Sequence, residues 1–172
     1  MLHRAQFFEW EIEYDKEVTA QAYSSLSVSC TCAYCQNFLS VCRNLPVEYI
    51  HLLEQLGIDP LKPAEIVEYY ENPDRTHFYG WWYHLAAQIT KDSAAKSVLL
   101  TPGIEMIIRN KADLADMEFP RPVIQIEFFS ISPGHWLKNR TIEIVTTNTI
   151  NENGIPLYQF PLWTCETRTF VL

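Results

Sequence analysis

The sequence has little glycine, little positive charge and no long apolar run. It holds five glycines in 172 residues, with no glycine-rich phosphate loop and no Gly-x-Ser-x-Gly nucleophile elbow. Lys and Arg total 13 against 21 Asp and Glu, so the formal net charge of −8 opposes binding to nucleic acid and to anionic lipid. No apolar stretch approaches the roughly 20 residues of a membrane span. We therefore expect no nucleic-acid partner and no membrane insertion.

The N-terminal region also lacks the apolar core of a signal peptide, because Glu9 interrupts it early. We expect a cytoplasmic protein, whose thiols are kept reduced. The odd total of five cysteines agrees with thiols rather than with a disulfide framework. The length fits a single domain over residues 1–172, and no repeat or linker composition divides the chain.

Hydrophobic periodicity predicts an α+β fold. Apolar and acidic residues alternate over 8–14, and apolar or sulfur-bearing residues alternate with hydroxyls over 26–32, which is typical of half-buried strands. The period then lengthens, predicting one helix from about 33 and another from Pro46 to Leu56 with Val47, Ile50, Leu53 and Leu56 along its apolar stripe. Gly57 is the expected left-handed C-cap. Residues 63–70 fit either a short third helix or a strand.

The rest of the chain has the pattern of strands. Turn residues separate five apolar segments: 78–89, 104–109, 123–129, 141–145 and 166–172. Asn151–Gly154 is a strong hairpin signal. We expect an antiparallel sheet of about six to eight strands, with two or three helices inserted at about 33–71 and gathered against it.

Four of the five cysteines lie within residues 30–42, and their positions follow the local period. Cys30 and Cys32 continue an apolar strand face, while Cys35 and Cys42 join the apolar face of the following helix. Reduced cysteine is among the most buried residue types. The leading interpretation is therefore that these thiols pack as small hydrophobes, although Cys30 and Cys32 also face a helix that begins directly after them.

A metal site is the second interpretation. Cys30-x-Cys32-x-x-Cys35 places three soft ligands at a strand-to-helix turn, and zinc takes four ligands in a tetrahedron. The candidates for the fourth ligand lie elsewhere in the chain: Cys42, His84 or Cys165. This alternative gives a zinc site built from Cys30, Cys32, Cys35 and His84.

A thiol-redox pair is the third interpretation. Cys32 and Cys35 form a Cys-x-x-Cys pair at a helix N-terminus, where the helix dipole favours a thiolate. Asn37 lies in the same helix between apolar neighbours, and a buried amide has four hydrogen-bonding positions to satisfy. Its side chain either ties a loop backbone to the helix or orients a ligand beside the thiols.

Three segments together resemble a known family. Cys32-Ala33-Tyr34-Cys35-Gln36-Asn37-Phe38, Leu56-Gly57-Ile58-Asp59-Pro60 and Tyr79-Gly80-Trp81-Trp82-Tyr83-His84 are similar to the Cys-x-x-Cys-x-Asn-Phe, Gly-Ile-Asp-Pro and Gly-Trp-Tyr-His-Phe segments of an uncharacterised bacterial family. The resemblance covers about residues 26–90 and carries no activity. It implies one site formed by Cys32, Cys35, Asn37 and His84. The sequence departs from the pattern by an extra tryptophan before Tyr83, which reverses the strand face of later residues, and by Leu85 in place of Phe.

Aromatic residues occupy both faces of the segment 78–87, so we expect that strand to be covered on both sides, with His84 as a core group. His77 and His135, beside turn residues, are expected to be exposed, and Trp136 to face solvent.

The chain is acidic and rich in aromatic residues. The leading hypothesis is therefore a non-catalytic, cofactor-free protein of interaction or immunity type that recognises a basic protein. The alternative is a zinc or thiol-redox site on Cys32 and Cys35.

Overall fold

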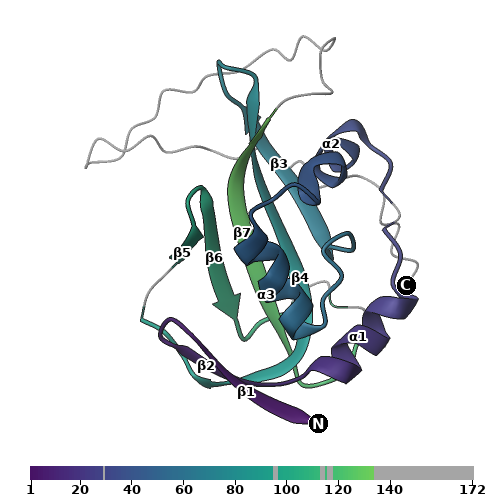
Figure 1. Ribbon diagram of the computed structural model, residues 1–172. Coiled ribbons are helices and arrows are strands. Elements are labelled where there is room, and N and C mark those ends of the chain that lie inside the picture. Colours follow the sequence, from purple (N-terminus) through teal and green to yellow (C-terminus); the bar gives the residue numbers. More distant parts are fainter. Residues whose placement is uncertain (29, 95–96, 113–114, 116–117, 134–172) are drawn as a thin grey trace.

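The computed structural model describes residues 1–28, 30–94, 97–112, 115 and 118–133, and the side chains of these residues up to 130 (Figure 1). The described elements follow one another as β1 (Leu2–Phe7), β2 (Trp10–Asp15), α1 (Lys16–Ser25), α2 (Ala33–Cys42), α3 (Val47–Leu56), β3 (Glu65–Glu71), β4 (Thr76–Lys91), β5 (Val98–Thr101), β6 (Ile104–Arg109) and β7 (Val123–Pro133). The predicted α+β class, with an antiparallel sheet of seven strands and three helices, is confirmed.

The long strand β4 organises the sheet. On one edge it pairs along most of its length with β7, and β6 and β5 follow outward. On its other edge the first half of β4 pairs with β3 and its last residues pair with β2, which continues to β1. Helices α2 and α3 lie over one face of this sheet, and α1 lies at its side (Figure 1).

The core lies between the sheet and the helices. Tyr79, Trp81, Tyr83 and Leu85 form the helix-facing pleat of β4, and each is at most 1% exposed, as the period-two pattern requires. Trp81 packs against Phe38 of α2 with ring centroids 4.9 Å apart. Aromatic contacts of this kind fix α2 above the first half of β4.

A chain of hydrogen bonds satisfies the polar atoms of this aromatic core. The Trp81 indole N–H donates to the Tyr49 hydroxyl at 2.9 Å, the hydroxyls of Tyr49 and Tyr83 lie 2.8 Å apart, and Tyr83 donates to the Pro60 carbonyl at 2.7 Å. Since each hydroxyl both accepts and donates, Tyr49 donates to Tyr83. The chain therefore ties α3 and the loop after it to β4.

Helix α1 fills the gap that β2 and β3 leave on the edge of β4. The Tyr23 hydroxyl accepts from the His84 backbone N–H (3.1 Å) and donates to its carbonyl (3.0 Å). Two residues further, the Ala86 N–H donates to the Thr19 hydroxyl at 3.2 Å. Buried backbone groups without a strand partner are thus satisfied by two side chains of one helix face.

The strand predicted over 26–32 is wrong, and helix α1 was not predicted. Residues 26–28 and 30–32 carry no strand assignment, although the backbone is extended at Leu26 and Cys32. Alternation in sequence indicates an extended backbone, whereas a strand also needs a free edge to pair with. Two of the three helices lie in the predicted interval 33–71, and α1 precedes it.

Two further details differ from the expectations. Of the two possibilities for residues 63–70, the structure shows a strand, β3, rather than a third helix. The apolar stripe of α3 is rotated: Tyr49 and Leu52 join Leu53 and Leu56 as buried residues, while Val47 is 56% exposed. The hydrogen bonds of Tyr49 draw that side chain, rather than Val47, into the core.

Gly57 is confirmed as the left-handed C-cap of α3, with φ of 77°. Several expectations fall outside the described residues: the segments 141–145 and 166–172, the Asn151–Gly154 hairpin, His135, Trp136 and Cys165. Within the part of the chain that the structure describes, no helix has both the length and the apolar composition needed to cross a membrane.

Candidate metal centre

Three cysteine sulfurs converge beside the N-terminus of α2. The Sγ atoms of Cys30, Cys32 and Cys35 all lie within 4.8 Å of one another, and those of Cys30 and Cys32 are 3.3 Å apart. Sulfurs at about 2.3 Å from a tetrahedral zinc ion are separated by about 3.8 Å, so the observed spacing needs only small adjustments to hold a metal. Over the described residues, this is the one group of three His, Cys, Asp or Glu side chains whose ligand atoms come close enough together to hold a metal ion. We call these three residues the cysteine triad.

Local backbone geometry brings the triad together. Cys32 is the N-cap of α2 with an extended backbone, and Cys35 follows it by three residues. The side chains at an N-cap and at the third helical position face each other, as they do in a capping box. Cys30 lies two residues before Cys32, on the same side of an extended segment.

A buried hydrogen-bond network anchors the first turns of α2 to the sheet. The Asn37 amide, 0% exposed, donates from Nδ2 to the Tyr79 hydroxyl at 2.9 Å. That hydroxyl donates in turn to the Tyr34 carbonyl at 3.2 Å. Asn37 therefore ties the helix to a strand side chain, which differs from the loop backbone expected as its structural partner. Its Oδ1 is buried without a hydrogen-bond partner among the described residues.

The three cysteines of the triad differ in how far their side chains are exposed to solvent. Cys35 is 3% exposed, whereas Cys30 and Cys32 are half-buried. Desolvation by burial raises the pKa of the Cys35 thiol well above its usual range, and the neighbouring Cys30 and Cys32 add to the rise. At neutral pH the metal-free Cys35 is therefore a neutral thiol, and a metal ion that binds it must displace the proton.

Tyr79 completes the electrostatic surroundings of the triad. Burial raises the pKa of its hydroxyl and the hydrogen bond from Asn37 opposes the rise, while electrostatic interaction with the neighbouring Glu68, Cys35 and Cys32 adds to it. The hydroxyl therefore remains protonated and keeps its role as donor to α2. The period-two pattern of β4 in the sequence predicts that Tyr79 lies on the helix-facing pleat. Its hydrogen-bond partners on α2 could be identified only from the three-dimensional structure.

The structure does not bring Cys42 or His84 to the triad. Cys42 lies about 10 Å further along α2, seven residues at about 1.5 Å each, and its thiol donates to the Pro60 carbonyl at 3.2 Å. Burial raises the pKa of Cys42 to about 11. These features make Cys42 a core thiol, as the packing interpretation held for all four cysteines.

His84 lies on the pleat of β4 opposite Tyr79 and Tyr83, as its position in the strand predicts. Its Nε2 donates to the Gln125 Oε1 at 3.3 Å, and its ring meets Phe119 edge-on. It is 3% exposed, in agreement with the expected core role. Of the four residues that the family resemblance groups, Cys32 and Cys35 therefore meet, Asn37 is joined to them through Tyr79, and His84 faces away.

The prediction that His77 is exposed is wrong. His77 is 1% exposed, and its Nδ1 lies 3.0 Å from the Glu68 carboxylate on β3. Burial raises the pKa of Glu68, and His77 opposes that rise. The position two residues before Tyr79, on the same pleat, was the signal for burial.

In the comparisons with known proteins, no protein-family model, no curated protein and no solved structure matches the chain. The site must therefore be interpreted from its own chemistry. Three thiols offer only soft donors, which select Zn²⁺, Cu⁺ or iron–sulfur clusters over Mg²⁺ and Ca²⁺.

Proposed function

We propose that this is a metal-binding protein whose cysteine triad holds a thiophilic ion, most simply zinc. The convergence of three sulfurs within 4.8 Å carries this proposal. Packing alone requires each cysteine to meet apolar neighbours, but it does not require half-buried sulfurs to meet one another. Three cysteines also supply three of the four ligands of a Cys₄ or Cys₃His zinc site, which leaves one position for a further ligand.

Such an ion would act on the fold at a specific place. The triad joins the segment after α1 to the first turn of α2, and Tyr79 joins that turn to β4. The thiolates would lie at the positive end of the α2 dipole, which favours their charge. A bound ion would thus fasten the loop and the helix to a rigid strand, which supports a structural rather than a catalytic role.

The test is metal analysis of the full chain. We expect one zinc per chain by elemental analysis, and cobalt substitution should give the intense near-ultraviolet thiolate-to-metal bands of a sulfur-rich tetrahedral site. Removing zinc with a chelator should make the half-buried Cys30 and Cys32 reactive toward thiol reagents. Cys35 and Cys42 should stay slow to react, because each is at most 3% exposed and burial raises the pKa of each. A reduced protein that takes up neither zinc nor cobalt would contradict the proposal.

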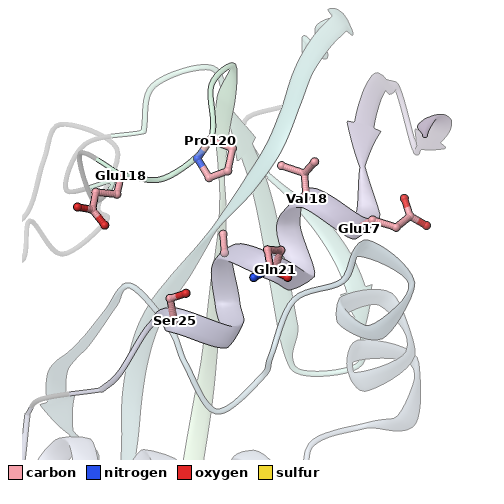
Figure 2. Close-up of a pocket in the computed structure, with 7 residues that line it drawn as sticks. Glu17, Val18, Gln21, Ser25, Glu118 and Pro120 are labelled. Carbon is pink, nitrogen blue, oxygen red and sulfur yellow. The ribbon is translucent and has the colours of Figure 1, made fainter.

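Binding of a basic protein is a second candidate, favoured by a hollow beside α1 (Figure 2). Its volume is about 410 Å³, and its lining combines two acidic residues with small and apolar ones: Glu17, Val18, Gln21, Ala22, Ser25, Glu118 and Pro120. Figure 2 shows Val18 and Gln21 on α1 facing the loop that carries Pro120. Two carboxylates beside apolar side chains, on a chain of net charge −8, suit a cationic amphipathic segment.

A matched pair of charge substitutions tests this second candidate. Val18→Lys introduces a positive charge into the hollow, and Val47→Lys introduces the same charge on α3; the two valines are 38% and 56% exposed. We expect an amphipathic lysine–leucine peptide to bind the wild type in a salt-dependent manner and to bind Val18→Lys at least about tenfold more weakly. Fluorescence anisotropy measures both affinities. Equal affinities of the two variants would exclude the hollow.

A further inference from the structure

We propose that Cys30 and Cys32 are a modification site at which a hydroperoxide forms a reversible disulfide, and that this disulfide expels the metal ion. The expulsion of the metal ion rests on the proposed metal site. The formation of the disulfide rests on the geometry of the two thiols alone.

The two sulfurs are close and accessible together. Their separation of 3.3 Å exceeds a disulfide bond of about 2.05 Å by little more than about 1 Å. Both residues are half-buried, so that a small peroxide can reach them from solvent. Reactivity toward peroxide follows exposure and thiolate character.

Cys35 is the member of the triad that is protected. It is 3% exposed and lies in the first turn of α2, a helix that the Tyr79 hydroxyl joins to β4 through its hydrogen bonds with Asn37 and the Tyr34 carbonyl. The Cys-x-x-Cys pair of Cys32 and Cys35 is the more familiar redox spacing, but the distances and exposures favour the Cys30 and Cys32 pair.

The reaction balances with a hydroperoxide as oxidant. One thiolate attacks a peroxide oxygen, the O–O bond breaks, and a sulfenic acid forms with release of water or alcohol after proton transfer. The second thiolate attacks the sulfenic sulfur, the S–O bond breaks, the S–S bond forms, and a water leaves. Two electrons pass from the two sulfurs to the peroxide. A dithiol reductant reverses the change by thiol–disulfide exchange.

Loss of the metal follows from the ligand count. Disulfide sulfurs are poor ligands because the thiolate is the form that binds metal. After oxidation Cys35 is the remaining thiolate of the triad, and one soft ligand does not retain zinc against competing chelators. Oxidation would thus release the ion, and the segment between α1 and α2 would no longer be joined to the first turn of α2 through the metal.

The experiment uses the zinc-loaded full chain exposed to a small excess of hydrogen peroxide. A chromogenic chelator reports released zinc, and tandem mass spectrometry after alkylation of the remaining thiols locates the modification. We expect one zinc released for every two thiols lost, a disulfide between Cys30 and Cys32, alkylated Cys35 and Cys42, and recovery of zinc binding after dithiol treatment.

Variants separate the possible outcomes. Cys42→Ser should leave both disulfide formation and zinc release unchanged, and Cys30→Ser should lose the disulfide. A disulfide that maps to Cys32 and Cys35, or zinc that stays bound after Cys30 and Cys32 have joined, would overturn this inference. A chain that binds no zinc yet still forms the Cys30 and Cys32 disulfide would contradict the proposed function and leave the modification site standing. Absence of that disulfide in the metal-free protein would remove the modification site itself.

Discussion

Replacing Cys35 with serine should lower zinc affinity by about 10² to 10³-fold. Structural zinc sites bind with roughly 10 to 16 kcal/mol shared among four ligands, so each ligand contributes about 2.5 to 4 kcal/mol. Serine keeps the size of the side chain and its hydrogen-bonding capacity but offers no thiolate. Competition with a chromophoric chelator measures the change, and the cobalt thiolate bands should weaken in parallel.

Cys42→Ser is the matched control for this substitution, because the two cysteines lie in the same helix and are both buried. In Cys42→Ser the serine hydroxyl replaces the thiol and can still donate to the Pro60 carbonyl, so folding should be retained. We expect wild-type zinc affinity from Cys42→Ser and the large loss from Cys35→Ser. Equal effects of the two substitutions would mean that the ion does not bind the triad.

Thermal unfolding provides a second readout of the same prediction. A ligand that binds the folded state stabilises it by about 2.7 kcal/mol at a concentration one hundred times its dissociation constant. Zinc should therefore raise the melting temperature of the wild type and of Cys42→Ser, and leave that of Cys35→Ser nearly unchanged. This readout reports binding to the folded protein, so it distinguishes a lost ligand from a general loss of stability.

The short-range part of the site was accessible from the sequence. Cys30 and Cys32 alternate in an extended segment, and Cys32 and Cys35 bracket the start of a helix, so their convergence follows from local geometry. What periodicity could not decide was whether apolar packing or metal binding accounts for this pattern, because both place sulfur on the same face. The structure adds that the three sulfurs lie within 4.8 Å of one another, and the proposal of a metal site rests on this convergence.

Contacts between elements far apart in the sequence could not be predicted from the sequence. Helix α1 was missed because its buried residues are Thr19 and Tyr23, which contact β4 through hydroxyl groups rather than through an aliphatic stripe. An amphipathic pattern records apolar burial, not hydrogen bonds to a strand edge. The burial of His77 had a local signal in its place on the pleat of Tyr79, but its partner Glu68 lies on another strand and could not be identified from the sequence.

Gly57→Ala should lower the free energy of unfolding by about 2 to 5 kcal/mol. Gly57 has φ of 77°, a left-handed conformation that costs a residue with a Cβ about 1 to 2 kcal/mol. In addition, a Cβ at this position would lie 2.4 Å from the Lys16 carbonyl oxygen, so the end of α3 and the start of α1 would have to separate. Overpacking of a close contact typically costs a further ~1 to 3 kcal/mol.

Gly103→Ala separates these two contributions, and chemical denaturation measures both variants. Gly103 also has a left-handed backbone, with φ of 85°, but a Cβ there would meet nothing within 4 Å. We expect Gly103→Ala to lose only the conformational part, about 1 to 2 kcal/mol, and Gly57→Ala to lose clearly more. The excess reports the approach of α1 to α3, and this approach orients α1 so that Thr19 and Tyr23 reach the edge of β4. If the two variants lose the same stability, α1 and α3 do not approach as closely as described, and the position of α1 on that edge needs another cause.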